Sequence, residues 1–142
     1  MRILTSVGLT AILLAASACT IETSSPSTTA NNLLTALSGT WRSTTAATAG
    51  ACSSTSYTIT PTGTNSANIT YAANCAGITV SGSGTGTLNG TTLNWTSTGN
   101  AGVCPFSLDG TATPTGTTSD LNLTYSGTVC GAPLSGAEIL HR

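Results

Sequence analysis

Few side chains in this 142-residue chain could do acid–base or nucleophilic chemistry, because charged residues make up only 5% of it. Beyond the N-terminal region, the charged or titratable polar residues are Arg42, Asp109, Asp120, Glu138, His141 and Arg142. General acid–base catalysis needs such groups within hydrogen-bond reach of one substrate. Asp109 and Asp120 are the candidate carboxylate pair, but their neighbours are typical of turns, and the penultimate His141 lies where chain ends fray. We therefore expect no catalytic residues and no enzyme.

The chain also lacks the patterns that hold common cofactors, metals and nucleic acids. It has no G-x-x-x-x-G-K-[ST] phosphate loop, and its three Arg with no Lys are too few for a nucleic-acid footprint. A four-thiolate zinc site needs closely spaced cysteine pairs, whereas the cysteines after residue 50 are 23, 29 and 26 residues apart. We expect no cofactor, no metal and no nucleic-acid partner.

The five cysteines are the reactive residues with the most informative positions. Four of them belong to the main part of the chain: Cys52, Cys75, Cys104 and Cys130. An even number of cysteines in a secreted protein predicts a disulfide framework, and an odd one requires an explanation. The fifth, Cys19, directly follows the apolar N-terminal residues 3–18. Its role is therefore interpreted from that segment.

Residues 1–18 have the features of a signal peptide: Arg2, an apolar run too short to span a membrane, and Ala16-Ser17-Ala18 before Cys19. This arrangement resembles the lipobox of bacterial lipoproteins. The resemblance implies cleavage before Cys19 and its lipidation by diacylglycerol with palmitate-type chains, which leaves an even four cysteines. Ala16 stands where that family usually has Leu. The same residues also fit an ordinary A-x-A cleavage site, so a soluble secreted protein with one spare thiol stays open.

Residues 19–36 are interpreted as the lipidated cysteine and a disordered Ser/Thr-rich tether. The segment from Thr20 to Asn32 has too few apolar side chains to offset the entropy of ordering. Only residues 32–37 could form a turn of helix. In the lipoprotein sorting pattern, Asp after the cysteine retains the protein at the inner membrane. Thr20 at that place implies a cell-envelope protein held at the outer membrane, with its domain outside the cytoplasm.

Residues 37–142 form one domain by length, with the composition of an all-β protein. Thr and aromatic residues favour strands, while Gly and Asn supply turns. Apolar residues alternate with polar ones, as in Ile69 and Tyr71 or Leu93 and Trp95. This period of two indicates strands with one buried face.

An internal repeat organises these strands. T-x-T-P-T-G-T at residues 58–64 recurs at 111–117, and N-[IL]-T-Y follows at 68–71 and 122–125. A middle copy leads into Asn94. Each unit holds two strands and two turns, so four units predict about eight antiparallel strands. Such a succession favours a small closed up-and-down barrel without exposed edges, with a β-sandwich as the alternative.

The start of the domain, residues 38–41, reads Ser-Gly-Thr-Trp and resembles the G-x-W opening of lipocalin and calycin barrels. In that family the Trp plugs one end of the barrel, and an Arg from the last strand stacks across it. The resemblance implies that Trp41 is the plug here. Arg142, at the end of the last predicted strand, would then close the barrel over Trp41 by a cation–π contact.

Four cysteines allow three pairings, and each cysteine falls at the same phase of its repeat. We therefore expect all four at one end of the barrel. Pairing between neighbouring units favours Cys52–Cys75 and Cys104–Cys130. Because the domain has few large apolar side chains, we expect these disulfides to be essential for its stability.

Two classes of function stay open. The preferred one is a structural or interaction module of the envelope, whose nearly uncharged Thr/Ser/Asn surface contacts a protein or a glycan. The alternative is a small calycin-like carrier that binds an apolar or carbohydrate ligand in the barrel mouth. The aromatic residues are expected to pack the core: Trp41, Tyr57, Tyr71, Trp95, Phe106 and Tyr125. A solvent-open cavity beside Trp95 or Tyr125 would favour the carrier, and a solid interior the interaction module.

Overall fold

The computed structural model describes residues 26–43 and 52–142. The predicted signal peptide, residues 1–18, and the predicted lipidation site Cys19 therefore lie outside the described part of the chain. The described elements are one helix and eight strands: α1 (Pro26–Leu37), β1 (Gly39–Ser43), β2 (Cys52–Pro61), β3 (Ser66–Cys75), β4 (Ile78–Asn89), β5 (Thr92–Ala101), β6 (Cys104–Thr115), β7 (Thr117–Val129) and β8 (Ala132–His141). Within these residues no helix has the length and apolar character that crossing a bilayer requires.

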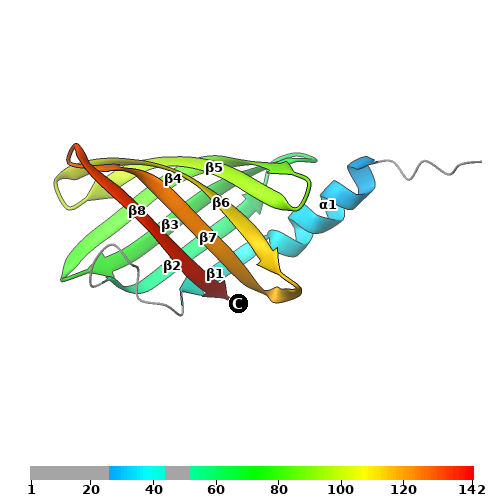
Figure 1. Cartoon of the computed structure of the whole chain (residues 1–142), viewed down its shortest axis with the longest axis horizontal. Coiled ribbons are helices and arrows are strands. Elements are labelled where there is room, and N and C mark those ends of the chain that lie inside the picture. Colours follow the sequence, from blue (N-terminus) through cyan, green and yellow to red (C-terminus); the bar gives the residue numbers. More distant parts are fainter. Residues whose placement is uncertain (1–25, 44–51) are drawn as a thin grey trace, which may run out of the picture.

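The eight strands form a closed antiparallel barrel in which each strand pairs with the next along the chain (Figure 1). Closure comes from a short ladder between β1 and β8, where Arg42 lies opposite His141 and Ser43 opposite Leu140. The prediction of an all-β up-and-down barrel of about eight strands is confirmed. The sandwich alternative is wrong, because the hydrogen-bonded ladder continues around the whole barrel and does not divide into two sheets.

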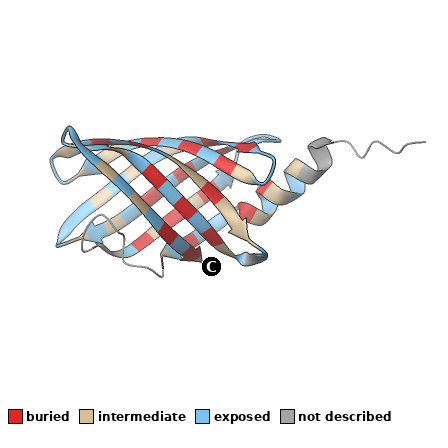
Figure 2. Cartoon of the chain, viewed as in Figure 1, coloured by how far each residue is buried: buried red, intermediate tan, exposed pale blue. Residues whose placement is uncertain are grey.

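The predicted alternation of side chains is visible along the strands, where buried and exposed positions follow one another (Figure 2). On β3, Ala67, Ile69 and Tyr71 are buried, whereas Asn68 and Thr70 between them are exposed. Successive side chains of a strand point to opposite faces, so the Thr, Ser and Asn residues of the repeat form the outer wall. The apolar residues of the same repeat form the core.

The repeat units that reach Cys75 and Cys130 end in hairpin turns of similar conformation. Ala76-Gly77 connects β3 to β4 with φ of 52° and 83°, and Cys130-Gly131 connects β7 to β8 with φ of 50° and 77°. Two successive residues in the left-handed region form the hairpin turn whose twist matches that of the flanking strands. Gly at the second position adopts this conformation without a steric penalty.

The helix α1 is longer than the sequence analysis predicted. We expected a disordered tether as far as residue 36 with at most one turn of helix, but α1 begins at Pro26 and has 12 residues. Pro is well tolerated in the first turn of a helix. Leu34 and Leu37 are buried against the barrel core. The tether prediction is therefore wrong from Pro26 onward, because burial of these leucines stabilises a segment whose composition alone indicates disorder.

Trp41 and Arg142 close the end of the barrel that α1 covers. Trp41 is completely buried, and its indole Nε1 donates a hydrogen bond to the carbonyl oxygen of Leu37 at 2.9 Å. The Arg142 guanidinium carbon lies 4.6 Å from the centroid of the Trp41 ring. The same guanidinium donates hydrogen bonds to the carbonyl oxygens of Ala36 and Ser38. The structure thus has the Trp–Arg closure that the calycin resemblance implied, with the end of α1 tied into it.

The two disulfides, Cys52–Cys75 and Cys104–Cys130, lie at the other end of the barrel, where β3, β5 and β7 end. This is the pairing between neighbouring repeat units. Disulfides form and persist in oxidising compartments and are rare in the cytoplasm. The two bridges therefore indicate an extracytoplasmic location.

Replacing Arg142 by Gln should loosen α1 from the barrel. The variant loses charge-assisted hydrogen bonds to the helix end and the cation–π contact with Trp41, so the free energy of unfolding should fall by about 1–3 kcal/mol. Urea unfolding followed by tryptophan fluorescence measures this change. Arg42→Gln removes an exposed arginine from the outer face of β1 and is the matched control. Equal losses in the two variants would contradict a specific role for the closure.

Replacing Cys104 and Cys130 together by Ala should lower the free energy of unfolding by about 3 kcal/mol, because the bridge restricts the unfolded chain. The Cys52/Cys75 double variant should lose a similar amount, since the two bridges span 23 and 26 residues. Denaturant unfolding with and without reductant provides the measurement. A wild-type protein that is equally stable in excess reductant would show that the bridges are dispensable.

Candidate functional site

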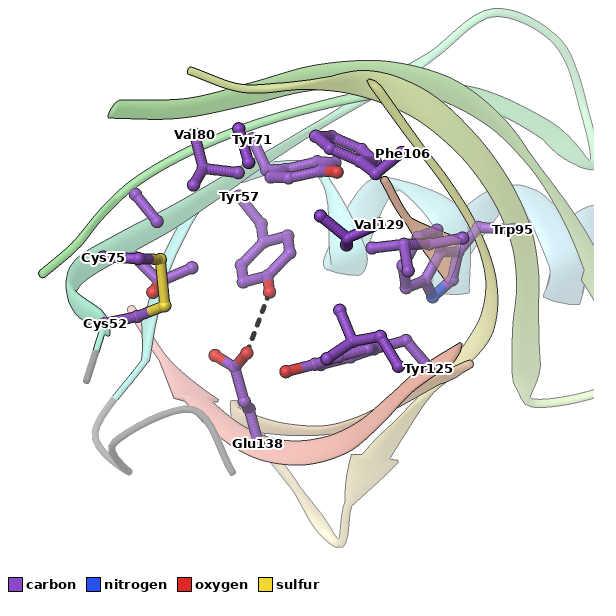
Figure 3. A pocket seen from close by; sticks show the side chains of 15 residues that line it. Cys52, Tyr57, Tyr71, Cys75, Val80, Trp95, Phe106, Tyr125, Val129 and Glu138 are labelled. Atoms are coloured by element: carbon purple, nitrogen blue, oxygen red, sulfur yellow. Dashed lines mark hydrogen bonds between the residues drawn. A yellow bond between two sulfur atoms is a disulfide. The ribbon is translucent and has the colours of Figure 1, made fainter. Parts of the chain in front are cut away.

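The barrel interior contains a cavity of about 280 Å³ that reaches the disulfide end. Its wall includes Cys75, Ala101 and Val129, the last residues of β3, β5 and β7. Five of the six aromatic side chains line it: Tyr57, Tyr71, Trp95, Phe106 and Tyr125. Figure 3 shows their rings around the open space. Farther along the barrel, a space of only about 10 Å³ remains between residues such as Ile69, Leu93 and Leu121. A separate space of about 280 Å³ lies at the α1 end, lined by Leu33 and Leu37 of the helix and by Trp41 and Leu121 of the barrel.

The cavity exists because rings on one strand oppose glycines on the next. Four of the five rings have a glycine as cross-strand partner: Tyr71–Gly82, Trp95–Gly110, Phe106–Gly99 and Tyr125–Gly136. A Cβ atom added to Gly136 would lie 2.5 Å from Tyr125 Cζ, and one added to Gly110 would lie 2.6 Å from Trp95 Cζ2. The rings therefore lie close to backbone that carries no side chain. The centre of this half of the barrel stays unfilled as a result.

Glu138 is a carboxylate inside this aromatic cavity, with only 4% of its surface exposed. It lies there because inward positions of β8 alternate, so Gly136, Glu138 and Leu140 share one face. The Tyr57 hydroxyl donates a hydrogen bond to Glu138 Oε1 at 3.1 Å. In Figure 3 the Tyr125 hydroxyl points toward the same carboxylate from the other side.

The three tyrosines of the cavity keep their hydroxyl protons at neutral pH. Burial, and after it the negative charge of Glu138, raises the pKa of Tyr57 far above its usual value. The same two causes raise the pKa of Tyr125, and burial raises the pKa of Tyr71 to about 12. All three hydroxyls can therefore donate hydrogen bonds, while the Glu138 carboxylate can only accept them when ionised.

Unpartnered polar atoms gather at this cavity. Four buried side-chain atoms in the described part of the chain have no hydrogen-bond partner: Tyr71 Oη, Trp95 Nε1, Ser97 Oγ and Glu138 Oε2. Three of them belong to cavity-lining residues, and Ser97 occupies the next inward position of β5 after Trp95. Each buried polar group without a partner costs about 1–3 kcal/mol. Their concentration marks a place where a bound molecule could complete the hydrogen bonds.

The structure does not bring together the acid–base residues that the sequence analysis considered for catalysis. Asp109 is exposed within β6, whereas Asp120 lies in β7 and forms an ion pair with His141 of β8. The prediction that both aspartates lie in turns is wrong, because Gly110 continues the strand as the partner of Trp95. His141 does not fray, since the β7–β8 ladder extends to it. Among the described residues, no group of three or more His, Cys, Asp or Glu could hold a metal ion.

Glu138 is the site residue that sequence reasoning missed, since it appeared there only as one of a few charged side chains. A signal was present in the spacing. Leu134 and Leu140 lie an even number of residues from Glu138, so an inward face that holds these leucines also holds the carboxylate. A lone carboxylate at an inward position of a strand could have identified the site.

No protein-family model and no curated protein matches this chain. Several solved structures are similar to it, two of which are described as redesigned β-barrels. One, mFAP1 bound to DFHBI, has a TM-score of 0.62 and 19% identity, covering 78% of this chain and 98% of that one. Another, b11L5F_LGL, has a TM-score of 0.59 and 18% identity, covering 78% and 94%. A third, EF1p2_mFAP2b bound to DFHBI, has a TM-score of 0.62 and 18% identity, covering 80% and 98%.

Identities this low establish the shared fold and nothing finer. The fold and the site together define a small eight-stranded antiparallel barrel with two different ends. One end is closed by α1, Trp41 and Arg142. The other holds an aromatic cavity with a buried carboxylate, Glu138.

Proposed function

We propose that this protein is a small extracytoplasmic binding protein that holds a compact, mainly apolar ligand in the barrel cavity. The observation that carries the proposal is the aromatic-lined space of about 280 Å³ at the disulfide end. Trp95 and Tyr125 both border this space. The sequence alone favoured an interaction module, but a cavity beside these two residues is the arrangement that favours a carrier.

The size and lining of the cavity restrict the class of ligand. Pockets for drug-sized molecules measure about 300–1,000 Å³, so this one, at about 280 Å³, fits a compact ligand of one to three rings or a short chain. Its polar lining groups are few, chiefly Glu138 and three tyrosine hydroxyls. A carbohydrate needs many hydrogen bonds to replace those it makes with water. The cavity therefore favours an apolar or aromatic ligand over a sugar.

The similar barrels support this proposal at the level of architecture. Two of them are described as bound to DFHBI, so barrels of this topology are found in complexes with a small molecule. We also propose that this protein binds its ligand without transforming it. Glu138 is the one charged residue of the cavity lining, and no nucleophile–base pair accompanies it among the described residues.

Filling the cavity mouth should weaken binding of a ligand. Ala73→Phe adds a ring to an inward, cavity-lining position of β3, and we expect it to weaken binding of the neutral fluorescent probe N-phenyl-1-naphthylamine at least about tenfold. Ala72→Phe places the same ring on the exposed outer face one residue earlier and is the matched control. Fluorescence titration measures both. Probe binding that Ala73→Phe leaves unchanged would place the probe elsewhere.

We propose in addition that Cys19 carries a lipid anchor that holds the barrel at the outer membrane. The support is the lipobox-like segment before Cys19, the spare fifth cysteine and the absence of Asp at position 20. The two disulfides are consistent with the oxidising environment that this location requires.

The anchor is tested by replacing Cys19 with Ser in a bacterial host that has an outer membrane. We expect the wild-type protein in the outer-membrane fraction, with an intact mass that corresponds to a chain starting at Cys19 with acyl groups. The Ser variant should lose the acyl mass and leave the membrane. A wild-type chain without acyl mass, with one thiol open to alkylation, would mean a soluble secreted protein.

A further inference from the structure

We propose that the ligand of this cavity is a small organic cation, an amine attached to an apolar or aromatic group, whose ammonium pairs with Glu138. The inference rests on the proposed binding function and names the chemistry of the ligand. It begins from a carboxylate that is 4% exposed and surrounded by aromatic rings.

The protein supplies no cation to this carboxylate among its described residues. Arg42 is exposed on the outer face of β1. Arg142 stacks on Trp41 at the closed end of the barrel, and His141 pairs with Asp120. A buried charge without a partner strongly destabilises a fold. A cationic ligand in the cavity, which is the space next to the carboxylate, would supply that positive charge.

The free hydrogen-bonding capacity of the carboxylate points to a donor. Oε1 of Glu138 accepts a hydrogen bond from Tyr57, which holds the side chain in place. Oε2 has no partner. An ionised carboxylate can only accept hydrogen bonds, and an ammonium group can only donate them. The two groups are therefore complementary at Oε2, whereas an anionic ligand would be repelled.

The rings around Glu138 suit the same class of ligand. Aromatic faces attract cations through their quadrupole, most strongly when the cation is removed from water. Tyr57, Tyr71, Trp95 and Tyr125 line the cavity that holds the carboxylate. An amine with an apolar body would place its charge at Glu138 and its body against the rings. A neutral apolar molecule of the same shape would leave Oε2 unpartnered.

The test compares three probes of one shape by competition against N-phenyl-1-naphthylamine at pH 7. They are 2-naphthylmethylamine, which is a cation, 2-ethylnaphthalene, which is neutral, and 2-naphthoate, which is an anion. We expect the amine to bind about tenfold or more tightly than the neutral probe, and the anion to bind most weakly.

Glu138→Gln removes the charge and keeps the shape and an acceptor for Tyr57. It should weaken binding of the amine about tenfold and leave binding of 2-ethylnaphthalene within about twofold. Asp109→Asn removes a carboxylate from the exposed outer face of β6 and is the matched control; it should change neither affinity. Thermal unfolding of each variant shows whether the barrel is intact. The comparison of probes on the wild-type protein does not depend on any variant.

The outcomes separate this inference from the function on which it rests. If the neutral probe binds in the cavity and the amine binds no tighter, the cation preference is wrong and the binding function stands. Tightest binding of 2-naphthoate would also overturn it. If none of the probes binds, both proposals fail. Amine selectivity that disappears in Glu138→Gln alone would establish the pairing.

Discussion

The interior of an eight-stranded barrel is just wide enough to be filled by side chains or to hold one small ligand, and how this width is filled determines the two ends of the molecule. Toward α1, the inward positions carry Leu93, Leu121 and Leu140, which meet at the axis and exclude space. Toward the disulfides, rings face cross-strand glycines such as Gly110 and Gly136. The same barrel therefore has a packed layer of leucines on the α1 side and an aromatic-lined hollow on the disulfide side. The difference lies in the glycines that face the rings of the hollow.

A barrel with an unfilled half has less apolar contact to stabilise it, and the other features of the chain offset this. The closed end concentrates its contacts, because Trp41 is held by Leu37 of α1 and by Arg142 from beyond the last strand. At the hollow end two disulfides tie neighbouring strands where side-chain packing is weakest. Bridges act mainly by restricting the unfolded chain, so they stabilise the barrel without occupying the cavity.

The strands, their number and the barrel could be predicted from the sequence, because alternation and the repeat act locally along the chain. The Trp41–Arg142 contact followed from a family resemblance and a position at the end of the last predicted strand. The length of α1 could not be predicted, since its stability comes from burial of Leu34 and Leu37 against a barrel that assembles from distant residues. The cavity could not be predicted from the sequence either, because the pairing of rings with glycines depends on the register between strands.

The same register explains why the polar groups of the hollow end belong together. Glu138 comes from β8, Tyr57 from β2 and Trp95 from β5, and only barrel closure brings these strands around one space. A barrel selected for stability alone has no need of a carboxylate at position 138, since apolar residues at positions 57 and 138 would remove both the buried charge and the hydroxyl that pairs with it. A surface module that contacts partners through its outer Thr and Asn residues has no need of a carboxylate inside. The position of Glu138 therefore supports the proposal that the barrel interior, more than its outer wall, binds a ligand.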